Sequence, residues 1–399
     1  FGSRIGMDQA RFLQLPFLAL AMVAKTRAMA KDSRPAKSKN RVLKVTPLKA
    51  ARGAAKAAAG ARRLSQHDLE SAILRRCAAE RDQLDKMMAP GVRLVPVLPD
   101  ATDTDDFPHA WARREGAKRT VRGAAEWHVP QGADPRRRML FFHGGSYTVY
   151  APQDKPYRSL ASRLAAACRL CVLAVDYRMA PEHLFPAAYE DCEAALRWVT
   201  AHGPDSATEA SLAQDVFVCG DSAGGGLALA VCVAPGRPVR RSLRGVVGIS
   251  PWTDLTASTP SYETRCWDAE RCFGDAVNAG VDRKGGREEA EVYLGKRGVA
   301  RHGRDWRASP FFAPAAKLRS MPPVLMHVGD YELILDESVL LHEKMKEAGH
   351  QDASVVVYPR MWHCFHEYSE GGGERQPLEK ALRAVRDIGR WVAARVSKD

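Results

Sequence analysis

Short apolar runs alternate with longer helix-like runs from Gly91 to the C-terminus. Such alternation predicts an α/β fold, with a mostly parallel sheet covered by helices on both faces. The runs expected to form strands are 93–97, 118–128, 138–142, 171–176, 216–219, 245–250, 323–328 and 354–358. The runs expected to form helices are 156–168, 187–201, 222–233, 335–348 and 377–396. In a sheet of this kind, we expect functional side chains at the carboxyl ends of the strands.

Two segments stand outside this alternation. Residues 254–315 form a polar, Trp-containing insertion, and residues 65–88 form a helix-like run ahead of the first expected strand. We expect both segments to form a cap over the functional site, within one catalytic domain at 64–399. The chain has 399 residues, of which 45% are hydrophobic, so it can bury a large core.

The charge is unevenly distributed along the chain. The formal net charge is +13, and residues 1–63 alone hold 15 Lys or Arg against 2 Asp or Glu. The rest of the chain therefore carries no net charge, and the basic character belongs to an N-terminal extension. A basic tail alone does not predict nucleic-acid binding, which also requires a recognisable binding module.

The extension at 1–63 has features of a targeting segment. Residues 13–24 form a largely apolar run that is too short to span a bilayer, and Ala28-Met29-Ala30 follows it. A signal peptide and an arginine-rich, acid-poor organelle presequence both fit this pattern. A basic tail in peripheral contact with anionic membrane surfaces is the third interpretation. The sequence does not choose a localisation among these three.

One short motif predicts the chemistry of the domain. Residues 220–224 read Gly-Asp-Ser-Ala-Gly, between the apolar run 216–219 and the helix-forming run 227–230. A strand, a sharp turn and a helix in this order would hold the Ser222 hydroxyl at the tip of the turn. The flanking glycines let the backbone bend tightly, and the helix N-terminus favours negative charge there. The motif predicts a serine hydrolase with Ser222 as nucleophile.

A glycine-rich loop adds to this prediction. Residues 143–147 read His-Gly-Gly-Ser-Tyr and follow the strand-like run 139–142. Backbone N–H groups in such a loop can stabilise the oxyanion that forms when a serine attacks an acyl carbonyl. Considered alone, the loop could equally be a plain tight turn. Its pairing with the serine motif favours the oxyanion hole.

These motifs carry a family resemblance. The chain resembles the hormone-sensitive-lipase-like branch of the α/β-hydrolases, which includes bacterial carboxylesterases and arylacetamide deacetylase. The matching segments are His143-Gly144-Gly145, then 177–188 (Tyr-Arg-Met-Ala-Pro-Glu-His-Leu-Phe-Pro-Ala-Ala), then 220–225 (Gly-Asp-Ser-Ala-Gly-Gly). The likeness runs from about residue 90 to the C-terminus. It implies an α/β-hydrolase fold and hydrolysis of short- to medium-chain acyl esters or acetyl groups.

The resemblance also implies the donors of the oxyanion hole. In the family, the glycine-rich loop and the residue after the nucleophile supply these N–H groups. Gly144, Gly145 and Ser146 occupy the loop here, and Ala223 follows the nucleophile. Gly145, Ser146 and Ala223 are the expected donors. Ser146 replaces a glycine that is usual in the family, and its N–H can serve if its backbone conformation is allowed.

The catalytic base is expected near the C-terminus, because the family order is serine, acid, histidine. His363 follows the strand-like run 355–358 and matches the family's catalytic histidine, with Cys364 in place of the usual glycine. His366 is the local competitor, and we expect it to face elsewhere. As base, His363 would take the Ser222 proton and return it to the leaving alcohol.

The triad acid is a choice among three carboxylates after the strand-like run 324–328. Alignment with the family's Asp-x-x-x-Asp pattern places Glu332 at the catalytic position, and a glutamate can accept the imidazole Nδ1–H as an aspartate does. Asp330 could reach the histidine if the loop runs differently. Asp336 best fits a cap of the following helix.

Other residues complete the prediction. Candidate pocket walls, each with ordinary packing as the alternative, are Tyr147, Trp252, Tyr262 and Trp267. We expect Arg178 and Glu182 to form a structural ion pair, and Asp221 to hydrogen-bond loop backbone. The sequence contains no phosphate loop, dinucleotide fingerprint or paired zinc-ligand spacing, so no cofactor or metal is expected.

The predicted function is that of a cofactor-independent serine carboxylesterase whose partner is a small acyl ester. The alternative is a non-catalytic small-molecule receptor on the same fold. Plant hormone receptors that resemble this branch have lost the catalytic histidine, so the presence of His363 argues against this alternative.

Overall fold

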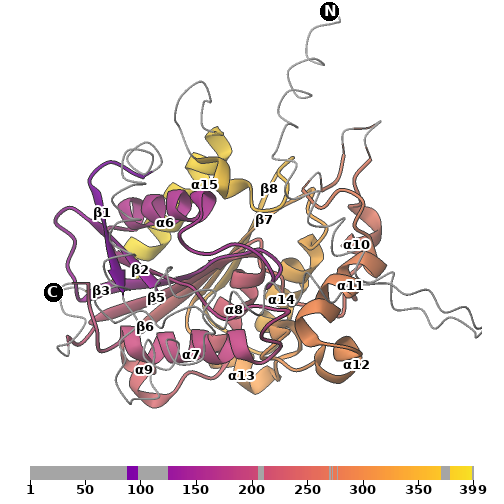
Figure 1. Cartoon of the computed structure of the whole chain (residues 1–399), viewed down its shortest axis with the longest axis horizontal. Helices are drawn as coiled ribbons and strands as arrows, with labels where there is room; N and C mark the ends of the chain where they lie inside the picture. Colours follow the sequence, from indigo (N-terminus) through magenta and orange to yellow (C-terminus); the bar gives the residue numbers. More distant parts are fainter. Residues whose placement is uncertain are drawn as a thin grey trace, which may run out of the picture. The chain divides into compact units, whose positions relative to one another are not determined.

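One eight-stranded sheet forms the centre of the described structure (Figure 1). The computed structural model describes residues 88–97, 125–204, 211–268, 271, 273–275, 277–369 and 378–397. The strands are β1 (Val92–Val97), β2 (Ala125–Pro130), β3 (Arg137–Phe142), β4 (Cys171–Val175), β5 (Asp215–Asp221), β6 (Leu243–Ile249), β7 (Val324–Gly329) and β8 (Ala353–Tyr358). Each strand overlaps one of the eight predicted runs, although residues 118–124 of the second run lie outside the described residues.

The sheet is mostly parallel, as predicted. Its strand order is β1-β2-β4-β3-β5-β6-β7-β8. The pairs from β4 through β8 are all parallel, whereas β2 runs antiparallel to both β1 and β4. Parallel neighbours end at the same edge of a sheet. The segments that follow β3, β5, β6, β7 and β8 are therefore brought together.

Helices cover both faces of the sheet (Figure 1). One face carries α6 (Lys155–Cys168) and α15 (Glu379–Ala393), and the other carries α7 (Ala187–Val199), α8 (Ser222–Val233) and α14 (Leu335–Glu347). These five helices lie on the five runs predicted to be helical. Shorter helices are α9 (Arg237–Ser242) and the 3-10 helix η3 (Phe365–Ser369). No helix in the described ranges has the length and apolar character that crossing a bilayer requires.

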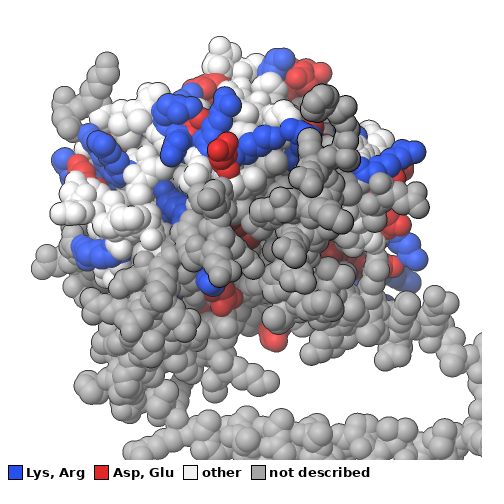
Figure 2. All heavy atoms as spheres, turned by 90° about the horizontal axis from the view of Figure 1, so that it is seen from above, with Lys and Arg blue, Asp and Glu red and all other residues white. Residues whose placement is uncertain are grey.

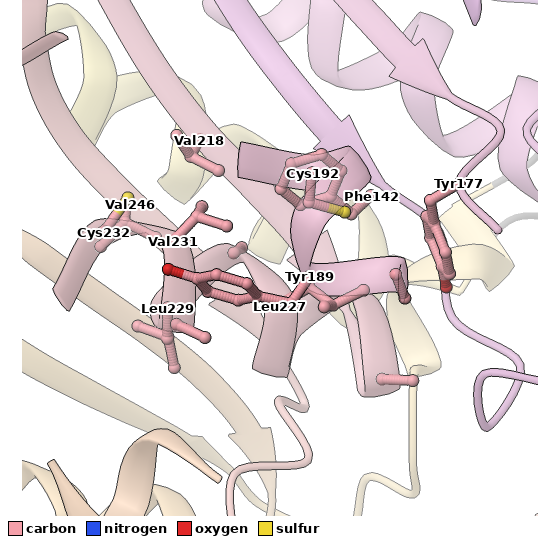
Figure 3. Packing of buried hydrophobic residues seen from close by; sticks show 14 of the residues in the cluster. Phe142, Tyr177, Tyr189, Cys192, Val218, Leu227, Leu229, Val231, Cys232 and Val246 are labelled. Carbon is pink, nitrogen blue, oxygen red and sulfur yellow. The ribbon is translucent and has the colours of Figure 1, made fainter. Parts of the chain in front are cut away.

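The core follows from the alternation of side chains along each strand. Successive residues of a strand point to opposite faces. In β3, Met139 and Phe141 pack with α6 and α15, whereas Leu140 and Phe142 pack with α7 and α8. Figure 3 shows Phe142 among apolar side chains of α7 and α8. All twelve residues of α8 are buried, so the helix that begins at Ser222 is held firmly against the sheet.

A helical insertion separates β6 from β7, within the range 254–315 that the sequence predicted to be part of a cap. It contains α10 (Ser261–Thr264), α11 (Arg283–Leu294), α12 (Gly298–His302) and the 3-10 helix η2 (Pro310–Phe312), with α13 (Ala315–Arg319) at its end. Tyr293 of α11 stacks on Tyr147, with ring centroids 3.8 Å apart. The insertion thus packs on the glycine-rich loop after β3. The predicted cap segment 65–88 lies outside the described residues except for Met88, as does the whole extension 1–63.

Two buried arginines pair with acidic residues. Arg158 of α6 makes a two-pronged contact with Glu126 of β2, at 2.9 Å from Nε and 2.8 Å from the terminal nitrogen. Arg178 binds Asp191 of α7 at 2.7 Å. The prediction that Arg178 pairs with Glu182 is therefore wrong. Asp191 lies on the buried face of α7, where its carboxylate meets both the Arg178 side chain and its backbone N–H.

Charges of both signs are mixed on the described surface. Figure 2 shows Lys and Arg side chains interspersed with Asp and Glu side chains on one face. Arg197 and Glu193, for example, form an exposed pair at 3.0 Å. This mixture agrees with the absence of net charge outside residues 1–63.

Candidate active site

A tight turn presents Ser222 between β5 and α8. The strand ends at Asp221, and the helix begins at Ser222, whose φ is 52°. The turn requires glycine at its flanks: a Cβ at Gly224 would lie 2.1 Å from the Phe142 carbonyl oxygen, and one at Gly220 would lie 2.3 Å from the Gly224 carbonyl oxygen. Close contact with β3 thus explains Gly224, and close contact within the turn explains Gly220. The side chain of Ser222 lies at the edge where the parallel strands end.

His363 and Glu332 meet Ser222 at this edge. His363 follows β8, and its Nε2 atom lies 2.9 Å from Ser222 Oγ. Its Nδ1 atom lies 3.2 Å from Oε2 of Glu332, which follows β7. The three side chains come from three strand ends and form one hydrogen-bonded row. This is the row expected of a nucleophile, a base and an orienting acid.

Hydrogen bonds to Oε1, the carboxylate oxygen that does not contact His363, fix the Glu332 side chain. Its side chain is fully buried, and Oε1 accepts hydrogen bonds from Ser250 Oγ at 2.7 Å and from the Gly329 N–H at 2.6 Å. Ser250 Oγ also accepts the Cys364 N–H at 3.1 Å. Ser250 thereby links the acid to the backbone directly after His363. Sequence reasoning did not single out Ser250; its position at the end of an apolar strand was the only signal.

The electrostatics favour a charged His363. Burial lowers the pKa of His363, but the hydrogen bond to Glu332 and the nearby negative charges outweigh it and raise the pKa to about 9. Burial also raises the pKa of Glu332, and the hydrogen bond and charge of His363 oppose that rise. Glu332 therefore stabilises an imidazolium at His363, the state that proton transfer from Ser222 would create.

The competing residues face elsewhere. Asp330 accepts the Arg360 N–H at 2.5 Å, which ties it to the turn after β8. Asp336 lies in the first turn of α14, where its own N–H donates to Ser261 Oγ at 3.2 Å. His366 is fully buried, with Nε2 3.2 Å from Nδ1 of His327. Among the candidate acids and bases, Glu332 and His363 are the ones that contact each other.

The glycine-rich loop has an unusual backbone conformation. Gly145 has a φ of 105°, and Ser146 has a φ of 52° in the left-handed region that glycine adopts more readily. In the part of the chain that the structure describes, the backbone N–H groups of Gly145 and Ser146 have no hydrogen-bond acceptor. Ala223, the second residue of α8, is completely buried beside Ser222. Free loop N–H groups at this edge are suited to bind an oxyanion.

Gly144 lies close to the Asp221 side chain. Its N–H donates a hydrogen bond to the Asp221 carboxylate. A Cβ at Gly144 would lie 2.5 Å from Asp221 Oδ2, so only glycine fits at this contact. Gly144 is thus packed against Asp221, and its part in the oxyanion hole stays a prediction. The expectation that Asp221 bonds loop backbone agrees with the same contact.

Most of the predicted pocket walls lie in packing positions. Trp252 and Tyr262 are buried, with Trp252 Nε1 donating to Tyr262 Oη at 3.1 Å and Tyr262 Oη donating to Glu337 at 3.0 Å. Tyr147 is buried against Tyr293, and Trp267 is half-buried. A groove of about 630 Å³ borders Tyr262 on the insertion, and the triad-like residues do not line it. For Trp252 and Tyr262, packing therefore explains the aromatic side chain.

One group of donor atoms next to the site has the composition of a metal-binding cluster. Atoms of Asp221, Cys364 and Glu367 lie within 4.8 Å of one another. Burial and neighbouring carboxylates raise the pKa of the Cys364 thiol well above its ordinary value. Because metals bind the thiolate, this environment disfavours metal binding.

Comparison with known proteins agrees with this architecture. A family model described as alpha/beta hydrolase fold matches residues 139–367, which is more than half of the chain. The chain belongs to the alpha/beta hydrolase family. The matched range includes Ser222, Glu332 and His363, together with the whole glycine-rich loop and the insertion between β6 and β7.

Relatives of this alpha/beta hydrolase are named as ester hydrolases. The acetyl-hydrolase of Streptomyces hygroscopicus is 36% identical over 248 residues, which are 61% of this chain and 73% of that protein. Carboxylesterase/phospholipase LipF of Mycobacterium tuberculosis is 28% identical over 262 residues, 64% of this chain and 61% of that protein.

A solved structure places the chain in a branch of the family. An esterase of the bacterial hormone-sensitive lipase family is similar with a TM-score of 0.60 and 27% identity, over 89% of this chain and 100% of that chain. This alpha/beta hydrolase is therefore a carboxylic ester hydrolase of the hormone-sensitive-lipase-like branch. The resemblance seen in the sequence motifs is confirmed.

Proposed function

We propose that this alpha/beta hydrolase cleaves short- to medium-chain acyl esters, or acetyl groups on small molecules, through an acyl-enzyme formed on Ser222. The observation that carries the proposal is the position of His363 between the other two residues. Its Nε2 lies 2.9 Å from Ser222 Oγ and its Nδ1 lies 3.2 Å from Glu332 Oε2. A receptor that had lost catalysis would not require this hydrogen-bonded arrangement of Ser222, His363 and Glu332.

In the first half-reaction, Ser222 Oγ attacks the ester carbonyl carbon as His363 Nε2 takes its proton. The N–H groups of Gly145, Ser146 and Ala223 bind the oxyanion. When the tetrahedral intermediate collapses, the bond to the alcohol oxygen breaks, and His363 gives its proton to the departing alcohol. Ser222 is then acylated, and His363 is neutral again.

In the second half-reaction, water takes the place of the alcohol. His363 accepts a proton from water as its oxygen attacks the acyl carbonyl, and the same N–H groups bind the second oxyanion. Collapse releases the carboxylic acid, and His363 returns the proton to Ser222 Oγ. Every proton that leaves a nucleophile is thus delivered to a leaving group, and no cofactor is consumed.

Glu332 holds His363 in the required tautomer. Its buried carboxylate accepts the Nδ1–H, so Nε2 is free to accept the proton of Ser222. Oxyanion donors act in the same buried environment. Removing one such donor typically costs about 10²–10³ in kcat.

The substrate range is proposed from the relatives and the insertion. The bacterial relative is named an acetyl-hydrolase, and the mycobacterial relative is named a carboxylesterase/phospholipase. In this chain, the helical insertion packs on the glycine-rich loop through Tyr293 and Tyr147. An insertion at this place would limit the space for the acyl chain, which favours short and medium esters over long-chain fat.

The test is hydrolysis of p-nitrophenyl esters from acetate to palmitate by the full chain. The unmodified protein, Ser222→Ala and the exposed control Glu193→Gln are assayed in parallel. We expect turnover on the short esters, equal turnover in the control, and loss of nearly all turnover in Ser222→Ala. Folded protein that is inactive on every ester would contradict the proposal and favour the receptor alternative.

A further inference from the structure

Two carboxyl groups, the buried Asp221 and the half-buried Glu367, lie next to Ser222 and His363, and the reaction above does not use them. One carboxyl oxygen of Asp221, one carboxyl oxygen of Glu367 and Cys364 Sγ all lie within 4.8 Å of one another. We propose that Asp221 and Glu367 share one proton in the active enzyme, and that Glu367 is a positioning residue acting through Asp221. Only its effect on kinetics rests on the proposed function.

The hydrogen bonds of Asp221 leave one oxygen without a donor. The side chain is completely buried directly before Ser222. Oδ2 accepts a weak hydrogen bond from Cys364 Sγ at 3.6 Å, and the carboxylate also receives the Gly144 N–H. Among the described residues, Oδ1 has no hydrogen-bond partner. Because a buried acceptor without a donor is unfavourable, a proton held by Glu367 would supply the missing donor.

Few positive groups lie near the pair. Arg163 of α6 reaches η3, but its Nε binds the Ser369 carbonyl oxygen at 3.0 Å. His363 is the cationic group that acts on both Asp221 and Glu367. The other described ionisable groups near the pair are phenols and a thiol: Tyr150, Tyr157, Tyr177, Tyr368 and Cys364. Each of these groups is neutral near pH 7. Two adjacent carboxylates in such a site cannot both ionise easily, so one keeps its proton.

The direction of the pKa shifts agrees with this geometry. Burial raises the pKa of Asp221 to about 7, and burial together with the charge of Asp221 raises the pKa of Glu367 to about 8. The two groups titrate as a pair rather than singly. Between these two values the pair holds one proton and carries one negative charge.

This arrangement would affect both the shape and the charge of the site. A protonated Glu367 that donates to Asp221 leaves the other Asp221 oxygen to bind the Gly144 N–H, which fixes the glycine-rich loop beside Ser222. The negative charge of Asp221 also raises the pKa of His363 and so stabilises the imidazolium. Loss of the shared proton at alkaline pH would double the negative charge of the pair. The second charge would raise the pKa of His363 further, so that His363 would stay protonated to a higher pH.

The test compares Glu367→Gln and Glu367→Leu with the exposed control Glu193→Gln, all in the full chain. A glutamine amide can donate to Asp221 Oδ1 but does not titrate, whereas leucine offers no donor. The first readout is the infrared C=O band of protonated carboxyls near pH 7, taken as the difference from Glu367→Gln. The contribution of Glu337, whose pKa burial also raises well above its ordinary value, cancels in that difference. We expect one carboxyl band in the difference spectra of the unmodified protein and of the control, each taken against Glu367→Gln.

The second readout is the pH dependence of kcat/KM on a short ester. We expect Glu367→Leu to lose at least about tenfold through the unpaired buried carboxylate. Glu367→Gln should recover most of that loss and lack the ionisation step of the pair. A difference spectrum without a carboxyl band would overturn the proposal, as would a pH profile of Glu367→Gln identical to that of the unmodified enzyme. If no ester is hydrolysed, the proposed function fails, and the infrared band still decides this inference.

Discussion

Glu332 binds His363 with one carboxylate oxygen and Ser250 with the other. Oε2 lies 3.2 Å from His363 Nδ1, and Oε1 accepts the Ser250 hydroxyl at 2.7 Å. The Gly329 N–H also donates to Oε1, at 2.6 Å. A glutamate has one more rotatable bond than an aspartate, and these donors hold it from the side away from the histidine. The acid is therefore fixed before any substrate arrives.

The first prediction concerns the identity of the acid. Glu332→Gln should lower kcat by about 10⁴, because an amide can present an N–H to His363 and favour the wrong tautomer. The fold should persist, since glutamine has the same size. The measurement is kcat on a short ester, with circular dichroism to verify folding. Asp330→Asn is the matched control and should stay near the unmodified rate; equal loss in both variants would contradict the assignment.

The second prediction concerns Ser250. Ser250→Ala removes the hydroxyl that donates to Glu332 and accepts the Cys364 N–H. One lost hydrogen bond to a charged group corresponds to about 1.5–3 kcal/mol, so kcat/KM should fall by roughly 10- to 100-fold. The exposed Ser320→Ala variant serves as control. Steady-state kinetics that are the same for both variants would show that Glu332 does not depend on Ser250.

The third prediction concerns pH. His363 acts as base only when it is neutral, and its pKa is raised to about 9 by Glu332 and nearby negative charges, against the opposing effect of burial. Lowering the pH below that value protonates the base, so kcat/KM should fall steadily from the alkaline side through neutrality. The pH profile of the unmodified enzyme tests this. A plateau that already begins near 6.5, the ordinary histidine value, would contradict it.

The fourth prediction concerns stability. Arg158→Met leaves Glu126 buried without its charged partner, which should cost about 3–5 kcal/mol in the free energy of unfolding. Urea unfolding near pH 7 measures this. The exposed control Arg197→Met should change stability by less than about 1 kcal/mol. If the two variants unfold at the same urea concentration, the buried pair contributes no more than a surface pair.

The same ion pair has a pH signature. Burial raises the pKa of Glu126, but Arg158 and His128 outweigh it and lower the pKa below 4.5 in the fold. A carboxyl with a lowered pKa stabilises the fold above its unfolded pKa and loses that contribution as the pH falls through its folded value. The stability difference between Arg158→Met and the unmodified protein should therefore shrink in acid.

The strands could be predicted where their pattern is local, and less well where distant contacts decide it. The central strands are apolar runs, because helices cover both of their faces. The strand β2 extends to Pro130, two residues past the end of the predicted run 118–128. It buries Glu126 and His128, and Arg158, which lies far along the chain, makes the burial of Glu126 possible. The antiparallel pairing of β1 and β2 had no signal in the alternation.

The site divides in the same way. Ser222 was predictable from its own turn, and His363 and Glu332 from the family resemblance, because each lies in a short recognisable segment. Ser250 was missed because its partner Glu332 is 82 residues away. The error at Arg178 has the same origin, since Asp191 binds it from the next helix and the nearer Glu182 does not. Contacts between separate helices and strands depend on the fold, so they cannot be predicted from a short sequence motif.

Covalent labelling of the nucleophile tests the central claim most directly. The full chain is treated with a fluorophosphonate probe, digested, and mapped by mass spectrometry, beside Ser222→Ala and His363→Ala. We predict one adduct per chain on Ser222, none in Ser222→Ala, and strongly slowed labelling in His363→Ala. Labelling of a different residue, or no labelling of folded protein, would contradict the account.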